Sequence, residues 1–211
     1  MKSSTKQLAP RLLASLLSIV VMAPMSPSYV FAQPASSQSN APLSQQQLSA
    51  LVAPIALYPD PLVSQILMAS TYPLEVGEAA TWQKQNSRLT GSALDNALQS
   101  QSWDPSVKSL VSFPQALQMM GSDLSWTQKL GDAVLAQQSD VMAAIQAMRA
   151  KAKQAGNLSS TSQQTVSTSG QTIIIQPANP QVVYVPTYNP SVVYGPWPYP
   201  AYPPPPPYYP P

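Results

Sequence analysis

Apolar residues recur at helical spacing from residue 43 to residue 156, in a segment rich in Ala, Leu, Gln and Met. Inside this segment an Asp is twice followed by Pro, at Asp60-Pro61 and at Asp104-Pro105. An Asp carboxylate accepts hydrogen bonds from the free N–H groups of a first helical turn, and Pro at the next position loses nothing there. Residues 43–156 are therefore predicted to form a helical domain of roughly six or seven short helices, with Asp60, Pro61, Asp104 and Pro105 as structural helix caps.

Further start and stop signals subdivide the domain. Ser44 and Gln47 have the spacing of a capping box. The last helical region is predicted to follow Ser122 and to carry an apolar stripe through Val141, Ile145 and Met148. Basic residues near its end suit the negative pole of the helix dipole, and Gly156 is a plausible stop. These basic residues are Arg149, Lys151 and Lys153.

A weak internal repeat accompanies the cap signals. The two Asp-Pro pairs are 44 residues apart, and so are Trp82 and Trp126. A helical repeat array shows such a period, although Pro73 and Pro114 do not keep it. Either a duplication or the coincidence of two good capping dipeptides explains the spacing.

The polar and apolar pattern changes after the helical domain. Residues 157–171 are Ser, Thr, Gln and Gly and are predicted to be a linker. Residues 172–195 contain β-branched runs at 172–175, 181–185 and 191–194, which predict a small β-hairpin or meander that docks on the helices. Residues 196–211 include ten Pro and four Tyr and are predicted to be a disordered tail of polyproline II character. The expected fold class is mainly α, with this small β element and tail appended.

The first 32 residues have the pattern of a secretory signal peptide. Lys2, Lys6 and Arg11 precede or begin an uncharged apolar stretch at 12–23, and cleavage is expected between Ala32 and Gln33. The alternative is a transmembrane anchor, for which this stretch is shorter than the roughly 20 residues that a bilayer requires. Residues 33–42 are then a linker, and the protein is expected in the periplasm or outside the cell, without a transmembrane span after cleavage.

Composition removes several classes of function. Loss of residues 1–32 lowers Lys plus Arg from 10 to 7 against 8 Asp and Glu, so the net charge becomes −1. Such a chain lacks the cationic surface that nucleic acid requires. The absence of His and Cys excludes Ser–His–Asp and Cys–His catalysis, disulfides and the usual zinc ligands. No cofactor or metal is expected, and we interpret the protein as non-enzymatic.

Carboxylates provide the remaining route to catalysis. Glu75 and Glu78 stand three residues apart on a predicted helix, as a glycosidase pair could. The simpler interpretation is a solvated first turn, where acids suit the helix dipole. Asp132 and Asp140 are likewise interpreted as solvated charges. A carboxylate-dependent hydrolase therefore stays an alternative rather than the leading hypothesis.

Aromatic residues suggest binding. Trp82, Trp103, Trp126, Tyr58 and Tyr72 would suit a protein that binds cell-wall polymers or other polysaccharides, but their positions beside helix junctions favour packing. A second set lies in the predicted β edges and tail, which cannot bury them all, and forms the candidate partner-binding site. Its members are Tyr184, Tyr188, Tyr194, Trp197, Tyr199 and Tyr202.

Several of these motifs occur together in one family. The runs Ala56-Leu57-Tyr58-Pro59-Asp60-Pro61-Leu62 and Trp103-Asp104-Pro105-Ser106-Val107 come first, followed by Phe113-Pro114 and the segment 179–197. In this order they resemble a family of bacterial exported proteins known as domain of unknown function 3300. The resemblance implies export in a Gram-negative bacterium and implies no activity or catalytic residue. Family members often continue past the proline tract, so this chain is expected to be either a short member or a truncated one.

The leading hypothesis is an exported scaffold or protein-binding module that contacts an envelope or extracellular protein, or a cell-wall polymer. An edge strand can recruit an extended peptide through backbone hydrogen bonds, and a polyproline tail can act as a stiff ligand. The sequence identifies neither the partner nor the oligomeric state.

Overall fold

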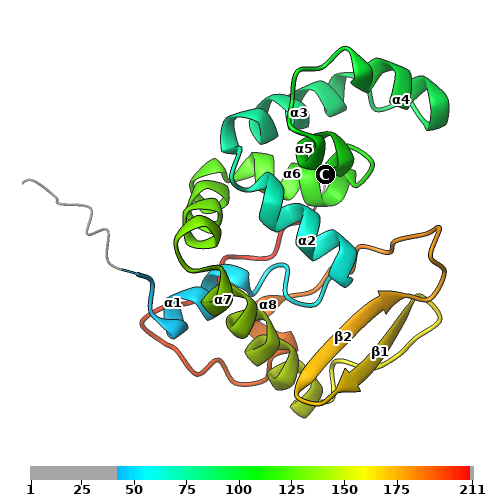
Figure 1. Cartoon of the computed structure of the whole chain (residues 1–211). Helices are drawn as coiled ribbons and strands as arrows, with labels where there is room; N and C mark the ends of the chain where they lie inside the picture. Colours follow the sequence, from blue (N-terminus) through cyan, green and yellow to red (C-terminus); the bar gives the residue numbers. More distant parts are fainter. Residues whose placement is uncertain (1–41, 210–211) are drawn as a thin grey trace, which may run out of the picture. The chain divides into compact units, whose positions relative to one another are not determined.

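The computed structural model describes residues 42–209 and confirms a mainly α fold with one small β-hairpin (Figure 1). Seven helices come first: α1 (Gln45–Val52), α2 (Asp60–Ala69), α3 (Pro73–Gln85), α4 (Gly91–Gln99), α5 (Pro105–Leu110), α6 (Pro114–Ser122) and α7 (Leu124–Gln154). Strands β1 (Gln164–Ser169) and β2 (Thr172–Pro177) and the short helix α8 (Pro190–Val193) follow. The expected signal peptide and the expected cleavage between Ala32 and Gln33 lie outside the described residues.

The helices begin where the sequence places cap residues, with one exception. Ser44 and Gln47 form the capping box of α1, and the Asp104 carboxylate accepts a hydrogen bond from Ser106 N at 2.8 Å. Hydrogen bonds from the Ser106 side chain and backbone lower the pKa of Asp104. Asp60 is not a cap: the N-cap position of α2 is Pro59, and the Asp60 carboxylate pairs with Arg149 instead. Pro stands in the first turn of α2, α3, α5, α6 and α8.

The core forms where the helices pack in pairs. The pairs α1 with α7, α3 with α6, and α2 with α5 make the largest helix contacts. Trp126, in the first turn of α7, is buried and donates from Nε1 to Leu51 O at 2.9 Å. Gly131, one turn further on, faces the carbonyl of Ser70 so closely that a Cβ would collide with backbone atoms. The close approach of α7 to the end of α2 therefore depends on this glycine.

Helix α7 is bent rather than continuous. Gln137 leaves helical geometry, with φ −150° and ψ 50°. Its side chain accepts from Leu43 N at 2.7 Å and donates to Leu43 O at 3.0 Å. The side-chain amide of Gln137 thereby satisfies both backbone hydrogen-bonding groups of Leu43, the residue that leads into α1.

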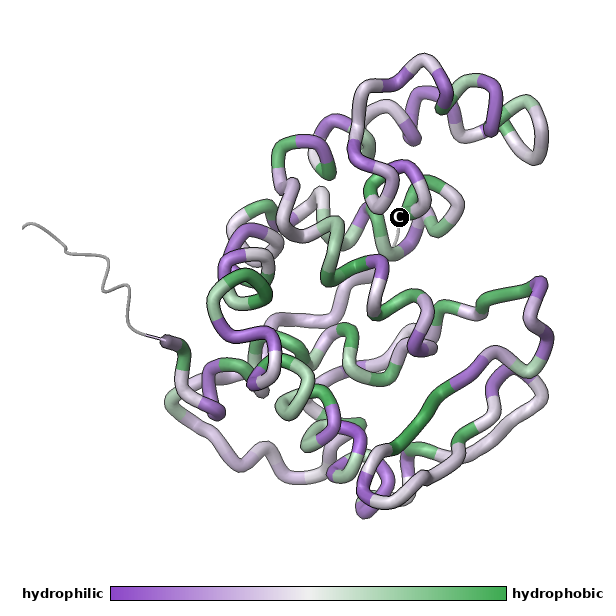
Figure 2. Tube along the Cα trace, in the orientation of Figure 1, coloured by the Kyte–Doolittle hydropathy of each residue, from purple (hydrophilic) through white to green (hydrophobic). Residues whose placement is uncertain are grey.

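The β-hairpin lies earlier in the chain than predicted. Strand β1 occupies the segment 157–171 that was expected to be a linker, and it pairs antiparallel with β2 from Gln164↔Pro177 to Ser169↔Thr172. Gly170, with φ +59°, lies in the two-residue turn between them. The prediction failed because β1 is mostly polar, so its sequence has no alternating apolar pattern that would indicate a strand with one buried face. Ile173 and Ile175 of β2 are buried against the helical domain. Figure 2 shows the apolar colour of this strand.

The two expected strands after β2 are not strands. Gln181 lies in a turn, and within the described residues the run 182–185 contributes one bridge, Asn179↔Val182, and no strand. Residues 190–193 form α8, and the Asn189 side chain caps its first turn by accepting from Ser191 N at 2.9 Å. The tail differs from the expected disordered segment as well, since Trp197 and Tyr208 pack against the core.

Arg149 occupies the centre of the molecule instead of the solvated end of α7. Only 2% of its surface is exposed, and it pairs with Asp60 at 2.6 Å. Its guanidinium also donates to Ala56 O at 2.8 Å, to Ile173 O at 2.9 Å and to Tyr58 O at 3.1 Å. One side chain thus joins α7 to the loop after α1, to the start of α2 and to β2. A buried cation requires this many partners because its hydration is lost.

We expect Arg149→Ala to lower the free energy of unfolding by about 3–5 kcal/mol, because Asp60 and three carbonyl groups lose their partner. Urea denaturation followed by circular dichroism measures the change. Arg149→Lys keeps the charge but not the planar guanidinium group. Its free energy of unfolding is expected to lie between that of Arg149→Ala and that of the original chain. An unchanged unfolding midpoint in Arg149→Ala would show that the ion pair does not hold these elements together.

We expect Gly131→Ala to lower the free energy of unfolding by about 3 kcal/mol, because the new methyl group meets the backbone of Ser70 and neither helix can yield locally. Gly77→Ala is the matched control on α3, where the methyl group meets only the flexible side chain of Leu124. That variant is expected to match the original chain within about 1 kcal/mol. Equal thermal unfolding of the two variants would contradict the close contact of α7 with α2.

Candidate functional site

Five aromatic residues form a continuous ladder between the loop after α1 and the tail. The members, in order of contact, are Tyr58, Tyr188, Tyr194, Trp197 and Tyr199. Successive ring centroids lie 6.1, 6.2, 6.3 and 5.8 Å apart, mostly edge to face. This geometry is favourable for aromatic pairs. Four of the six residues of the candidate partner-binding site therefore contact one another within the fold.

Tyr188 and Tyr194 are anchors of the C-terminal segment rather than exposed contact residues. Tyr194 is only 3% exposed, and its hydroxyl donates to Ala53 O at 2.6 Å. Tyr188 is half-buried with its hydroxyl directed inward, where it donates to the same carbonyl at 2.9 Å and accepts from Leu57 N at 3.3 Å. These hydrogen bonds join residues 188–194 to the loop after α1. The expectation that these two tyrosines are exposed is wrong, because it assumed strands too short to bury them.

Burial changes the acidity of the ladder tyrosines. It raises the pKa of Tyr58 to about 12, and it raises the pKa of Tyr188 and of Tyr194 above the ordinary value of 10.0. The cause is the loss of hydration that the phenolate would suffer. All three hydroxyls therefore remain neutral hydrogen-bond donors at any pH near neutrality.

The remaining aromatic residues of the candidate site lie nearer the surface. Trp197 is half-buried, and its Nε1 lies 3.1 Å from Tyr199 O and 2.9 Å from Tyr202 O, which folds the chain back on itself. Lys151 Nζ lies 6.0 Å from the ring centroid of the half-buried Tyr199. Tyr202 is exposed and lines a groove of about 480 Å³ beside Trp126 and Leu51.

Tyr184, like Tyr202, keeps the exposure that the sequence predicted for the set. It is 42% exposed, and Val182 beside it is 60% exposed, whereas Val183 and Val185 pack against the core. This alternation is that of a strand with one covered face. Among the hydrogen bonds of residues 42–209, none uses the backbone N–H or C=O of residues 183, 184, 185 or 187. The segment 181–187 borders an open groove of about 690 Å³ whose other wall is residues 112–115, including Phe113. Figure 2 marks the apolar character of this stretch.

The outer edge of β1 is less available than the edge-strand hypothesis requires. The Ser160 hydroxyl accepts from Val166 N at 2.8 Å and lies 3.2 Å from Val166 O. Thr161 N donates to Gln164 O at 2.8 Å. The preceding residues therefore cover most of this edge, a common way of protecting a strand from unwanted pairing.

The acidic residues considered for catalysis act as structural acceptors. Glu75 Oε2 accepts from Asp104 N at 2.6 Å, and Glu78 Oε2 accepts from Trp103 Nε1 at 3.1 Å. These two bonds join α3 to the residues that precede α5. Trp103 is buried and meets Trp82 edge-on at 5.9 Å, so these rings pack at a helix junction. The negative Asp104 raises the pKa of the nearby Tyr72.

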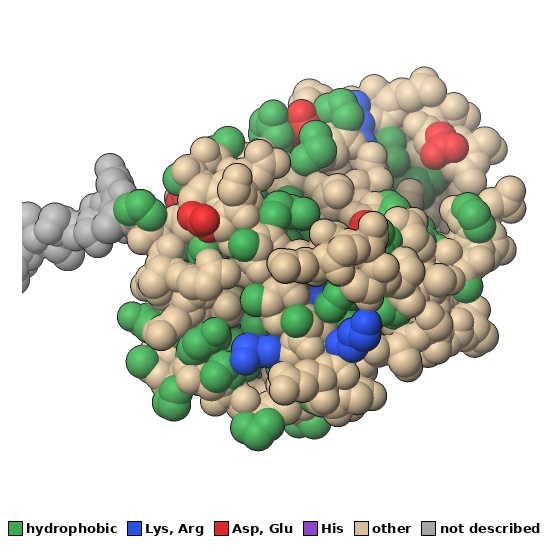
Figure 3. Space-filling view, turned by 60° about the horizontal axis from the view of Figure 1, so that its bottom comes forward, with side chains coloured by type: hydrophobic (Ala, Val, Ile, Leu, Met, Phe, Trp, Pro, Cys, Tyr) green, Lys and Arg blue, Asp and Glu red, His purple; other side chains and the backbone are tan. Residues whose placement is uncertain are grey.

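Two classes of site are not seen in the described part of the chain. Between residues 42 and 209 no three acidic side chains gather as metal ligands would. Over the same range no helix combines the length and the hydropathy that crossing a bilayer demands. The face drawn in Figure 3 shows few charged side chains among many apolar and polar ones.

Arg149 is the structural residue that sequence reasoning missed. Its position contained a signal, since Val141, Ile145 and residue 149 are four apart and share one face of α7. An Arg on the apolar stripe of a helix requires buried acceptors, and Asp60 with nearby carbonyl groups supplies them.

We expect the free energy of unfolding to fall above pH 10. A tyrosine whose pKa is higher in the folded than in the unfolded chain contributes its full stability below the unfolded value of 10.0 and loses it as the pH approaches the folded value. For Tyr58 the loss is about 2–3 kcal/mol by pH 12. Urea unfolding at pH 8 and pH 12 measures it, and Tyr58→Phe is expected to reduce the dependence while Tyr188 and Tyr194 retain their share. Equal stability of the original chain at both pH values would contradict the buried hydroxyls.

Comparison with known proteins places the chain in a family without a described activity. The chain is similar to the uncharacterized protein YacH of Escherichia coli (strain K12), with 42% identity over 193 residues. The match covers 76% of this chain and 31% of that protein, so the chain spans less than a third of the length of this relative. No solved structure matches. The family described as "Protein of unknown function (DUF3300)" matches residues 44–211, which confirms the resemblance seen in the motifs, and the chain belongs to that family.

Proposed function

We propose that this protein is an exported, non-enzymatic binding module that captures an extended segment of an envelope or extracellular protein along residues 181–187. Export is supported by the sequence pattern of residues 1–32. The observation that carries the binding proposal is the segment itself. Val182 and Tyr184 expose apolar surface on its outer side, and its backbone groups from residue 183 to residue 187 have no partner within residues 42–209.

Backbone hydrogen bonding determines the kind of partner. An extended segment with free N–H and C=O groups offers the same pattern as the edge of a sheet, and a second extended peptide satisfies it by adding a strand. Pro186 lacks an N–H, so at this position only its C=O is available to the added strand. The exposed side chains of Val182 and Tyr184 would contact alternate residues of that peptide. The segment 181–187 is uncharged, so an uncharged or apolar partner strand meets no unpaired charge there.

The groove beside the segment adds a place for a side chain. Phe113 and Pro114 form an apolar wall opposite residues 181–185. An aromatic or aliphatic side chain of the bound peptide can enter this groove and lose contact with water, which is the usual origin of a binding hot spot.

Neither alternative gains support from the geometry. A polysaccharide binder would present flat aromatic faces, but Trp103 and Trp126 are buried and donate hydrogen bonds inside the fold. A carboxylate-dependent hydrolase would place two acids in a cleft, but Glu75 and Glu78 accept hydrogen bonds from the residues that precede α5.

We expect a photo-crosslinking amino acid at Val182 to trap a protein partner in the exported fraction of the producing bacterium, because this side chain points outward from the proposed strand. Val192 on α8 is the matched control, since both residues are valines and are exposed to similar extents, 60% and 65%. The partner identified by mass spectrometry is then used in binding assays. Tyr184→Ala is expected to weaken binding about tenfold without altering the unfolding midpoint, and Val192→Ala is expected to leave it unchanged. Equal crosslinking at both valines, or at neither, would contradict the proposal.

A further inference from the structure

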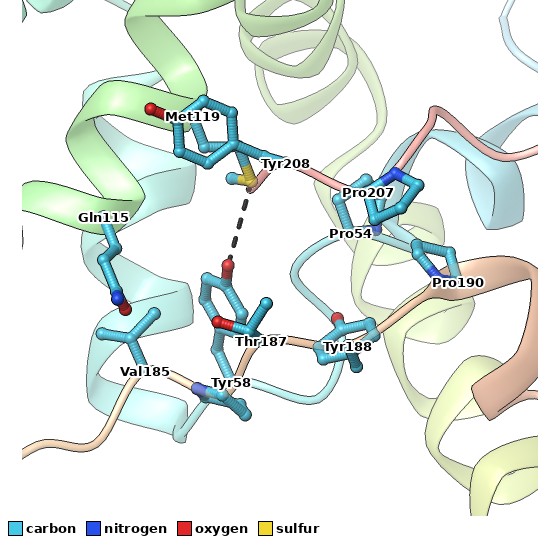
Figure 4. Close-up of a pocket in the computed structure, with 11 residues that line it drawn as sticks. Pro54, Tyr58, Gln115, Met119, Val185, Thr187, Tyr188, Pro190, Pro207 and Tyr208 are labelled. Atoms are coloured by element: carbon cyan, nitrogen blue, oxygen red, sulfur yellow. Dashed lines mark hydrogen bonds between the residues drawn. The ribbon is translucent and has the colours of Figure 1, made fainter. Parts of the chain in front are cut away.

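A second groove, lined by aromatic and proline rings, lies where the tail returns to the helical domain. We call it the proline groove and define it by its walls: Pro54, Tyr58, Gln115, Met119, Tyr188 and Pro190. The walls come from the loop after α1, from α6 and from the segment before α8 (Figure 4). None of these side chains carries a charge. Such a surface suits an uncharged, preformed chain rather than a polar or ionic ligand.

The tail of this same chain occupies the groove. Figure 4 shows the Tyr208 ring beside Met119 and Pro207 facing Pro54 and Pro190. The space left around them is about 20 Å³, little more than one water molecule fills, so the fit is close. Five consecutive prolines, 203–207, lead into this contact. They favour polyproline II, whose rigid backbone loses little entropy on docking.

The contact is held by rings and not by backbone hydrogen bonds. Within the described residues, the backbone of 203–209 takes part in none of the hydrogen bonds. A contact of this kind can be exchanged for another chain with the same rings, because nothing in it depends on covalent continuity with the fold.

Tyr58 supplies the polar group that orients a ligand. Its buried hydroxyl donates only to the thioether of Met119, at 3.8 Å, and a thioether is a weak acceptor. Burial raises the pKa of Tyr58 to about 12, so the hydroxyl stays protonated. The carbonyl groups of a polyproline II chain are free of internal hydrogen bonds. A carbonyl that enters the groove would therefore improve the hydrogen bond of Tyr58.

We infer that the proline groove is a recognition site for an extended proline-rich segment ending in Tyr, and that residues 203–208 of the chain occupy it as an internal ligand. A proline-rich segment of another protein molecule replaces the tail when its concentration exceeds the effective concentration of the tail, which is in the millimolar range for a short tether. The site adjoins the strand-adding segment of the proposed function, because Gln115, Val185 and Thr187 line both grooves.

The test uses a dye attached to the tail of the full chain. The sequence contains no Cys, so Tyr209→Cys supplies one attachment point, at a residue that is 65% exposed. Fluorescence anisotropy reports whether the tail is docked. A synthetic peptide with the sequence of residues 201–209 is expected to lower the anisotropy to that of the same labelled chain carrying Tyr208→Ser, with half of the effect at about millimolar concentration. A peptide with Ala in place of Tyr208 is expected to need about tenfold more.

Two results would overturn the inference. If Tyr208→Ser leaves the anisotropy unchanged, the tail does not occupy the groove. If Tyr208→Ser lowers the anisotropy but the peptide does not, the contact belongs to the fold and recognises no separate ligand. Neither measurement involves the partner of the proposed function, so failure of one proposal does not imply failure of the other.

Discussion

The buried guanidinium of Arg149 is the constraint on which the arrangement of the other elements depends. It has lost its water, so Asp60 and the carbonyls of Ala56, Tyr58 and Ile173 must all remain in place around it. These partners fix the loop after α1 against α7 and β2. That loop then presents the carbonyl of Ala53 to two tyrosine hydroxyls and sets the ring of Tyr58 in the wall of the proline groove. The contacts of Arg149 therefore position the Tyr58 wall of the proline groove and, through the bond of Tyr188 to Ala53, the end of the segment 181–187.

Local signals sufficed for most of the helical domain. The helix-start signals depend on only three or four neighbouring residues. Ser44, Asp104 and the helix-initiating prolines each stand at the helix start that the sequence predicts. Asp60 was misjudged because its position allows two uses, a cap and an ion pair, and only the distant Arg149 decides between them. The polar strand β1 was missed for the opposite reason. Its pairing depends on β2 and on the turn at Gly170 and leaves no apolar pattern in its own sequence.

The segments 179–184 and 189–194 have related sequences but different structures. At both 179–184 and 189–194 the Asn side chain accepts from the backbone N–H two residues later, at 3.0 and 2.9 Å. The N–H three residues later donates to the Asn carbonyl at 3.0 Å in each. The first turn is thus the same, as the same residues dictate. Afterwards the second motif continues into α8 while the first becomes extended, so the difference comes from packing and not from local preference.

This difference matters for function because it leaves the last tyrosine of each motif in a different environment. Tyr194 ends the second motif, is buried, and donates its hydroxyl to Ala53 O. Tyr184 ends the first motif, and the fold leaves it exposed beside an unpaired backbone. A side chain with an apolar ring and a polar tip gains most when the ring is covered and the hydroxyl finds a carbonyl, as Tyr194 demonstrates within the same chain. An extended peptide laid along residues 181–187 would offer Tyr184 both a covering surface and main-chain carbonyls. Tyr194 therefore makes, within this chain, the same kind of contact that we propose Tyr184 makes with a bound peptide.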